Sequence, residues 1–200
     1  MSEVERQILE IKKNVEQYAG EKVCGSVIQG SAEIGPATDP VAVARWAVGV
    51  MERLDASAGE LRRTRIMRSC GRACLNRNNK SLGEGRERRL RYASEDDFLD
   101  AEVQSPQFGT RLERGRTTLI QHYTPRAYDP PMRCYCSLLW KLPDAERASA
   151  TYCQCSRGFV EGYWEGVLGR PVEVEVLATA LQGASECSFK IELSRPDRNR

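Results

Sequence analysis

The stretch TYCQCSRGFVEGYWEGVLGRPVEVEVLATALQGASECSFKIEL, residues 151–193, decides the fold that this sequence predicts. From about residue 156 to residue 168 its apolar side chains recur at helical spacing. Residues 170–181 and 186–193 then alternate apolar and polar side chains on either side of the turn signal QGAS, which is typical of β-strands. We therefore expect a helix followed by two antiparallel strands.

The segments upstream complete a sheet and place helices before it. Residues 115–124 and 132–142 are apolar or alternating runs bounded by Pro or Gly, and they predict two further strands. Helical spacing over 3–19, 40–57, 59–74 and 95–103 predicts helices, with Asp39 and Ser94 as N-caps and Gly20 as a C-cap. Residues 76–89, rich in Asn, Gly and charge, predict a loop. The predicted fold is α+β, with a helical region (1–105) packed on one face of a mostly antiparallel α+β region (106–193) in one compact unit, followed by a tail (194–200).

Three glycines of the predicted helix, Gly158, Gly162 and Gly166, fall four residues apart and form one stripe. Each costs about 1 kcal/mol relative to alanine inside a helix, so the stripe must bring something close to the backbone. Either another element or a ligand pocket could fill that role.

Composition limits the class of protein. The chain has 200 residues, 40% of them hydrophobic and 29% charged, with a net charge of +2, which suits one ordinary domain. The N-terminal residues MSEVERQILEIKKN contain no apolar signal-peptide core, and the longest apolar run (41–51) is too short to span a bilayer. We expect a cytoplasmic protein without a membrane partner, and leave a homodimer open.

Eight cysteines need an explanation in a reducing compartment, where disulfides do not persist. Seven of them lie in spaced groups, which favours a site over scattered small buried side chains: Cys70 and Cys74, Cys134 and Cys136, Cys153 and Cys155, and Cys187.

The C-terminal segment resembles the 4-vinyl reductase domain, a small-molecule-binding module that also serves as the sensory domain of bacterial activators responding to aromatics. The pattern runs from Cys153 through Gly158-Phe159, Gly162-Tyr163 and Gly169-Arg170 to Gly183 and Cys187, over under a fifth of the chain. A weaker resemblance links the whole chain to amino-thiazoline carboxylate hydrolase-like proteins, with no catalytic motif that matches position by position.

The first resemblance implies a zinc site beside an enclosed pocket for an apolar ligand. Cys153 and Cys187 match two of the family's metal-binding positions, whereas Thr179 stands where the family has a third cysteine, and no residue matches its upstream acid. The remaining ligands would then come from Cys134, Cys136 or Cys155, since strand residues two apart share a face, with Cys70 and Cys74 as a less favoured source. Such a thiolate-rich site would select zinc or an iron–sulfur cluster, and a zinc there would be structural.

We expect a sensor or carrier that binds a small apolar or aromatic ligand between the helical region and the sheet. The candidate lining residues are Tyr135, Trp140, Phe159, Gly162, Tyr163 and Trp164.

Two other classes of function remain open. A hydrolase or thiol-dependent enzyme could use Cys70 or Cys74, whose arginine neighbours would favour a thiolate, or the single histidine, His122. A nucleic-acid-binding adaptor could use residues 62–91, which hold eleven Lys or Arg against two Glu but no recognisable DNA-binding motif.

Overall fold

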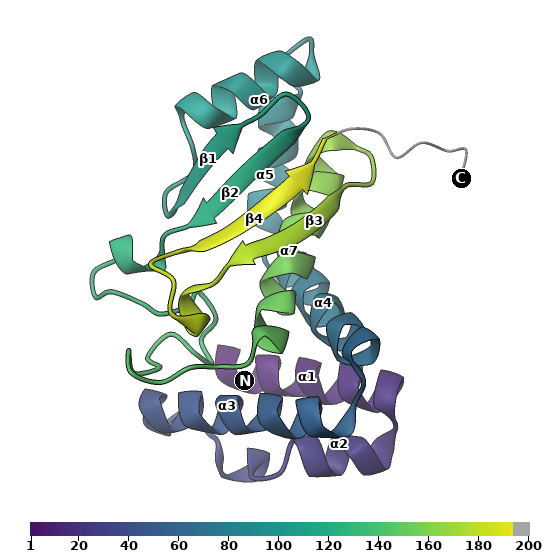
Figure 1. Cartoon of the computed structure of the whole chain (residues 1–200), viewed down its shortest axis with the longest axis vertical. Helices are drawn as coiled ribbons and strands as arrows, with labels where there is room; N and C mark the ends of the chain where they lie inside the picture. Colours follow the sequence, from purple (N-terminus) through teal and green to yellow (C-terminus); the bar gives the residue numbers. More distant parts are fainter. Residues whose placement is uncertain (194–200) are drawn as a thin grey trace.

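A computed structural model describes residues 1–193 and confirms the α+β fold (Figure 1). The helices are α1 (Glu3–Ala19), α2 (Glu21–Val27), α3 (Pro40–Ser57), α4 (Glu60–Arg77), α5 (Asn79–Arg89), α6 (Glu95–Gln104) and α7 (Ala150–Leu168). The strands are β1 (Thr110–Arg114), β2 (Thr118–Tyr123), β3 (Glu173–Ala178) and β4 (Cys187–Glu192). Short 3-10 helices cover Ser31–Glu33, Pro125–Ala127 and Ala180–Gln182.

The predicted caps are present at the helix ends. The Asp39 side chain accepts a hydrogen bond from the Ala42 amide at the start of α3, and Ser94 does the same for Asp97 in α6. Gly20 ends α1 with a φ of 87°, a conformation that glycine adopts without strain. Within residues 1–193, every helix falls short of the length and hydrophobicity that a bilayer span requires.

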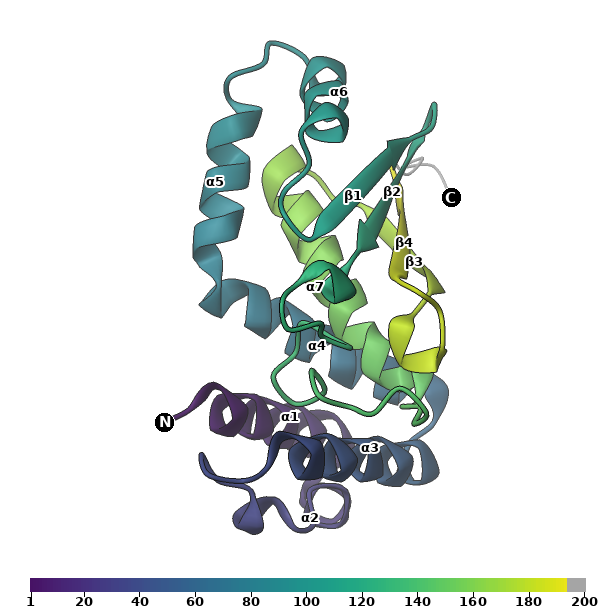
Figure 2. The same ribbon diagram turned by 90° about the vertical axis from the view of Figure 1, so that its left-hand side faces the viewer.

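The four strands form one antiparallel sheet in the order β1-β2-β4-β3. Helix α7 lies against one face of this sheet, with α5 on the far side of α7 (Figure 2). Trp164 from α7, Phe189 from β4 and Leu119 from β2 are buried in the core between helix and sheet. This core holds the upper part of the molecule in Figure 1 together.

A second core lies among α1, α2, α3, α4 and the first turn of α7, in the lower part of Figure 1. Val15, Val50 and Leu54 are fully buried there. Leu138 and Leu139, which come from the long connection between β2 and α7, are buried in the same cluster. Helices α4 and α7 contribute to the boundary between the two cores, and the space left there is the cavity described below.

The predicted glycine stripe packs against neighbouring helices. A Cβ at Gly158 would lie 2.2 Å from the Arg68 carbonyl oxygen of α4, and one at Gly162 would lie 3.0 Å from Leu75 Cδ2. At the same crossing, Gly71 of α4 faces α7. A Cβ at Gly71 would lie 1.9 Å from the Cys155 carbonyl oxygen. The stripe is therefore a helix-packing surface, and not a ligand-binding one.

Three local predictions are wrong. Residues 132–142 form turns and loops, because the leucines of this run pack into the helical core while β1 pairs with β2 as a hairpin. Residues 79–89, predicted as a loop, form α5. Cys153 and Cys155 lie inside α7, which begins at Ala150, so they do not project from one face of an extended segment.

Candidate functional site

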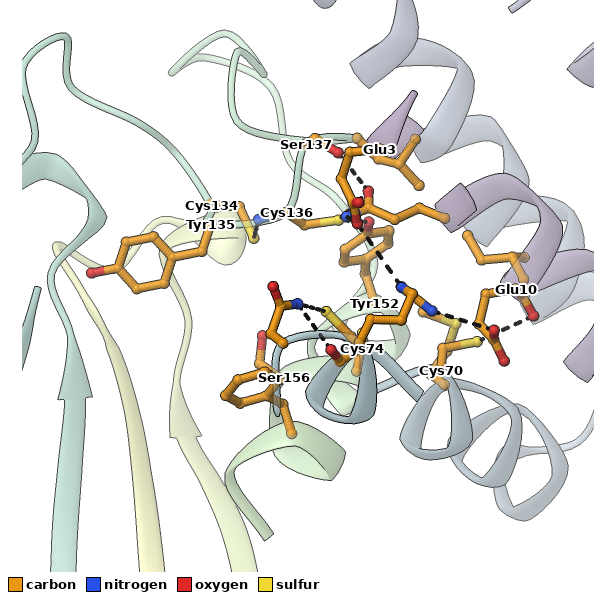
Figure 3. Close-up of a pocket in the computed structure, with 18 of the residues that line it drawn as sticks. Glu3, Glu10, Cys70, Cys74, Cys134, Tyr135, Cys136, Ser137, Tyr152 and Ser156 are labelled. Atoms are coloured by element: carbon orange, nitrogen blue, oxygen red, sulfur yellow. Dashed lines mark hydrogen bonds and ion pairs between the residues drawn. The ribbon is translucent and has the colours of Figure 1, made fainter. Parts of the chain in front are cut away.

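A cavity of about 430 Å3 lies between the two cores, with walls from α1, α4, α7, the end of β2, the start of β4 and the connection between β2 and α7 (Figure 3). Its volume falls within the range of small-molecule pockets, about 300–1,000 Å3. Ile11, Met67, Leu138 and Phe159 provide apolar wall, and Tyr123, Tyr135 and Tyr152 provide rings. Tyr135 is also 38% exposed, so the cavity reaches the surface beside this ring.

Thiols make up much of the remaining wall. Six of the eight cysteines line the cavity, two from α4, one from α7, one from β4 and two from the β2–α7 connection: Cys70, Cys74, Cys155, Cys187, Cys134 and Cys136. All eight cysteines of the chain are free. Cys24 lies elsewhere, on α2 with its sulfur 3.4 Å from the Lys12 carbonyl oxygen of α1, and Cys153 lies outside the cavity wall.

Burial keeps these thiols protonated. It raises the pKa of Cys136 from 9.0 to about 11, although the Tyr152 hydroxyl partly opposes the shift. Burial also raises the pKa values of Cys70, Cys134 and Cys155, and for Cys155 the neighbouring Cys70 and Cys136 thiols act in the same direction. At neutral pH the cavity therefore presents neutral S–H groups.

Cys136 links the β2–α7 connection to two helices. Its Sγ lies 3.1 Å from Gln7 Oε1 on α1 and 2.8 Å from the Tyr152 hydroxyl on α7. Ser137 Oγ donates to the same Gln7 oxygen at 2.8 Å. The backbone amide of Cys136 also approaches the Cys134 sulfur at 3.5 Å, and both residues belong to one short loop of the β2–α7 connection (Figure 3).

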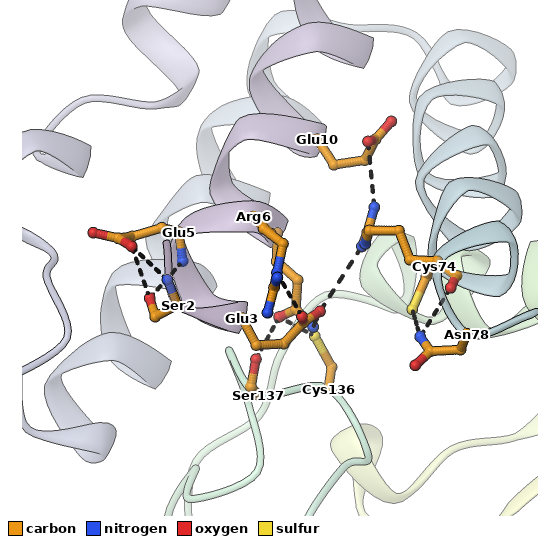
Figure 4. A network of polar contacts seen from close by, with 11 residues as sticks. Ser2, Glu3, Glu5, Arg6, Glu10, Cys74, Asn78, Cys136 and Ser137 are labelled. Atoms are coloured by element: carbon orange, nitrogen blue, oxygen red, sulfur yellow. Dashed lines mark hydrogen bonds and ion pairs between the residues drawn. The ribbon is translucent and has the colours of Figure 1, made fainter.

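The charged groups at the edge of the cavity are paired with one another (Figure 4). Arg77 Nη1 of α4 lies 3.3 Å from Glu10 Oε2 of α1, and its Nη2 lies 4.0 Å from Glu3 Oε1. Glu3 also binds Arg6 at 3.0 Å. Among residues 1–193, every buried side-chain nitrogen or oxygen without a hydrogen-bond partner belongs to a residue outside the cavity wall. The cavity thus leaves no buried polar group of its own unsatisfied.

Two of the six predicted lining residues, Tyr135 and Phe159, lie on the cavity wall. The other four, Trp140, Gly162, Tyr163 and Trp164, lie elsewhere. Gly162 faces Leu75, the Tyr163 hydroxyl accepts from Arg88 at 3.1 Å, and Trp164 Nε1 donates to Gln121 Oε1 at 2.8 Å under the sheet.

The predicted metal-binding residues separate into two places. Cys134, Cys136, Cys155 and Cys187 line the cavity. Cys153 lies beside the Thr179 hydroxyl and near Cys187, and its burial raises its pKa to about 12. Cys187 has the Ala180 amide 3.3 Å from its sulfur, and the Thr179 hydroxyl is buried without a hydrogen-bond partner. Nowhere in residues 1–193 do three or more His, Cys, Asp or Glu side chains gather as a metal ion requires, so these residues do not fit four-coordinate zinc.

Cys70 and Cys74, the thiols predicted as nucleophiles of an enzyme, are not readily deprotonated. Burial raises the pKa values of both Cys70 and Cys74, and the lowering effect of Arg77 on Cys74 is smaller. His122 lies on β2 with its Nδ1 2.9 Å from Ser188 Oγ and 3.0 Å from Glu186 Oε1, and it does not line the cavity that both thiols line. The structure therefore gives the thiol-enzyme interpretation no support.

Much of the basic charge in residues 62–91 is neutralised within the molecule. Arg68 and Arg72 of α4 bind Glu161 of α7 at 2.5 and 2.8 Å, and Glu161 is buried. Arg88 binds the buried Glu102 at 2.7 Å. These arginines hold helices together, which leaves a weaker basic surface than the sequence indicates.

Several wall residues lie outside the sequence-based prediction, among them Gln7, Ile11, Met67, Tyr123 and Tyr152. Ile11 occupies the apolar face of α1, so its burial was predictable, but its position on a cavity depends on how α1 meets the β2–α7 connection. The grouping of the cysteines was the one signal in the sequence that pointed to this site.

No family model matches the sequence, and no curated protein matches it either. The 4-vinyl reductase resemblance therefore rests on the pattern from Cys153 to Cys187 alone. Among solved structures, the chain is similar to an H-NOX protein from S. oneidensis, with 9% identity over 100% of both chains and a TM-score of 0.49. It is also similar to a structure described as "Modulating Heme Redox Potential Through Protein-Induced Porphyrin Distortion", with 13% identity over 96% of both chains and a TM-score of 0.43. Both TM-scores lie below 0.5, so neither likeness supports a conclusion about function.

Proposed function

We propose that this protein binds a small, uncharged, apolar or aromatic molecule in the cavity between its two cores, as a sensor or carrier. The observation that carries the proposal is the character of the wall: apolar side chains, tyrosine rings and six thiols that burial keeps protonated. A ligand of this kind gains from leaving water and requires no charged partner.

The paired charges at the cavity edge support an uncharged ligand. An anionic ligand would compete with Glu3 and Glu10 for Arg77, and a cationic one would have to displace Arg77 from both carboxylates. Either displacement leaves a partly buried charge without its partner, at a cost of the order of 1–3 kcal/mol. A neutral ligand leaves the network in Figure 4 intact.

Heme is not part of this proposal, although one of the similar solved structures concerns the redox potential of heme. The single histidine, His122, lies off the cavity, so an iron ligand would have to come from a thiol, a phenol or the Met67 thioether. Burial disfavours the anionic form of these groups, as the raised pKa values of Cys136 and Tyr135, about 11 and about 12, indicate. The wall therefore offers neither a histidine nor a group that is readily anionic for such an iron.

Ligand-observed NMR with phenol, indole and naphthalene, together with native mass spectrometry of the purified protein, tests the proposal. We expect saturable binding of at least one aromatic, because the cavity volume accommodates each of them. Ser156→Phe places a ring into the cavity from α7 and should abolish that binding.

Ser57→Phe is the matched control, because Ser57 is exposed at the end of α3, away from the cavity. It should bind as the parent does, and urea unfolding should show that both variants are folded. The proposal fails if none of the three aromatics binds and no small molecule co-purifies. Equal binding by Ser156→Phe and the parent would place the ligand elsewhere.

A further inference from the structure

The six thiols point to a more specific class of ligand for the same cavity, and the inference rests on the proposed function. Apolar walls alone would need no cysteine, because leucine or valine excludes water equally well. Here thiols from four separate parts of the chain, α4, α7, β4 and the β2–α7 connection, line one cavity. Two of them, Cys134 and Cys136, lie on one loop with a sulfur-to-amide distance of 3.5 Å between them.

A divalent metal is a poor match for these thiols. Metal binding requires thiolates, so each ligand must lose its proton, and several sulfur ligands leave net negative charge on the site. Burial opposes that change at every one of the six positions. The wall also offers no unpaired cation to offset the charge, since Arg77 is bound to two carboxylates.

We propose that the cavity captures neutral trivalent arsenicals that carry one aromatic or small apolar group, through the thiols of Cys134 and Cys136. In the capture of an aryl arsenoxide, two As–S bonds form while the As–O bonding and two S–H bonds break. The two thiol protons leave with the oxygen as one water molecule. Arsenic stays trivalent, so no oxidant or reductant is needed, and reactants and products are all uncharged.

The rest of the cavity suits such a molecule. The arsenic centre would lie at the Cys134–Cys136 loop, and the organic group would lie against the tyrosine and apolar wall. Capture also replaces the Cys136 S–H, which otherwise contacts Gln7 on α1 and Tyr152 on α7. The β2–α7 connection would then lose two of its contacts to the helices, which gives capture a structural consequence.

Phenylarsine oxide is the probe, with intact-protein mass spectrometry as the readout. We expect one adduct per chain, with a mass gain equal to the reagent less one water, released by an excess of a small dithiol. Capture should proceed at neutral pH and change little as the pH falls, whereas alkylation of the same thiols by iodoacetamide should be slow because that reaction requires the thiolate.

Serine variants locate the two sulfur atoms. Cys134→Ser and Cys136→Ser should each weaken retention about a hundredfold or more, because a single thiol loses the effective concentration that a second one on the same chain provides. Cys155→Ser, which keeps the loop pair, and Cys24→Ser, which lies outside the cavity, should retain the adduct. Urea unfolding confirms that each variant is folded.

The inference is overturned by the absence of an adduct on the folded parent, or by retention in the Cys134→Ser and Cys136→Ser variants equal to that of the parent. Loss of the adduct in Cys155→Ser alone would also overturn the assignment to the loop pair. Binding of an arsenic-free aromatic, measured on the same samples, separates this failure from that of the proposed function. If the parent binds the aromatic but does not capture the arsenical, the inference fails and the proposed function stands.

Discussion

At the scale of single residues, Gly158 sets the distance between α4 and α7. A Cβ there would lie 2.2 Å from the Arg68 carbonyl oxygen, and this backbone atom cannot move aside without shifting the helix. We expect Gly158→Ala to lower the free energy of unfolding by about 1–3 kcal/mol or more through overpacking. Urea-induced unfolding followed by circular dichroism measures the change.

Gly162 provides the comparison one turn further along the same stripe. Its Cβ would lie 3.0 Å from Leu75 Cδ2, the end of a flexible side chain, and at ordinary van der Waals distance from the Arg72 side chain. Because alanine is favoured over glycine in a helix by about 1 kcal/mol, Gly162→Ala should be close to neutral. Equal destabilisation by the two variants would contradict the close approach at Gly158.

The sequence predicted the stripe but not its partner. Three glycines at regular spacing are visible in residues 158–166, whereas Gly71 stands alone among arginines and cysteines in α4. Only the packed structure shows that Gly71 and Gly158 meet on opposite sides of one helix crossing. A single glycine carries too little local signal for such a prediction.

At the scale of elements, α4 and α7 are also joined by charge. Glu161 of α7 is buried and binds both Arg68 and Arg72, and the exposed fractions of those arginine side chains are 34% and 42%. Glu161→Gln should lower the free energy of unfolding by about 1–3 kcal/mol, less than the loss of one partner of a fully buried pair, because water screens the arginines. Chemical denaturation gives the value.

Glu165→Gln is the control for that change. Glu165 lies one turn along α7, binds Arg72 at 2.7 Å and has 27% of its side chain exposed. Its replacement should cost less than that of Glu161, because water can replace part of its contact. A larger effect at Glu165 would show that the buried carboxylate does not hold the two helices.

The elements also show where prediction from local pattern stops. Helices α1, α3 and α6 carry caps and apolar periodicity, and the sequence predicted each of them. The run 132–142 has a strand-like composition, yet its leucines are buried among α1, α3 and α7. Whether an apolar run pairs in a sheet or packs on helices depends on contacts distant in sequence, which a local pattern does not contain.

At the scale of the whole molecule, the cavity exists because two separate cores meet. Helix α7 contributes Tyr152 to one core and Trp164 to the other, and the β2–α7 connection closes the space between them. The sequence predicted a pocket between the helical region and the sheet, with Tyr135 and Phe159 in its wall. Its thiols were expected as metal ligands, and their shared position became evident only when four distant segments were placed together.

The buried thiols make stability depend on pH above neutrality. Burial raises the pKa of Cys136 from 9.0 to about 11 and that of Cys153 from 9.0 to about 12. Below about pH 9 these thiols are protonated in both the folded and the unfolded chain, so their contribution to stability is complete there. As the pH rises from about 9 toward 11 or 12, the unfolded chain releases protons that the folded chain keeps, and stability falls.

Each such thiol lowers the free energy of unfolding by up to about 1.4 kcal/mol per pH unit in this window. Cys70, Cys134 and Cys155 act in the same direction, because burial raises their pKa values too. Urea unfolding in the presence of a reducing agent, from about pH 8 to about pH 10, should therefore show a steep loss of stability. The Cys134→Ser/Cys136→Ser double variant should lose stability less steeply, since two of the titrating groups are gone while the lysines and tyrosines remain. If the free energy of unfolding falls equally steeply with pH in the parent and the double variant, these two thiols are not shielded from water. That result would contradict the uncharged cavity wall on which the proposed ligand binding depends.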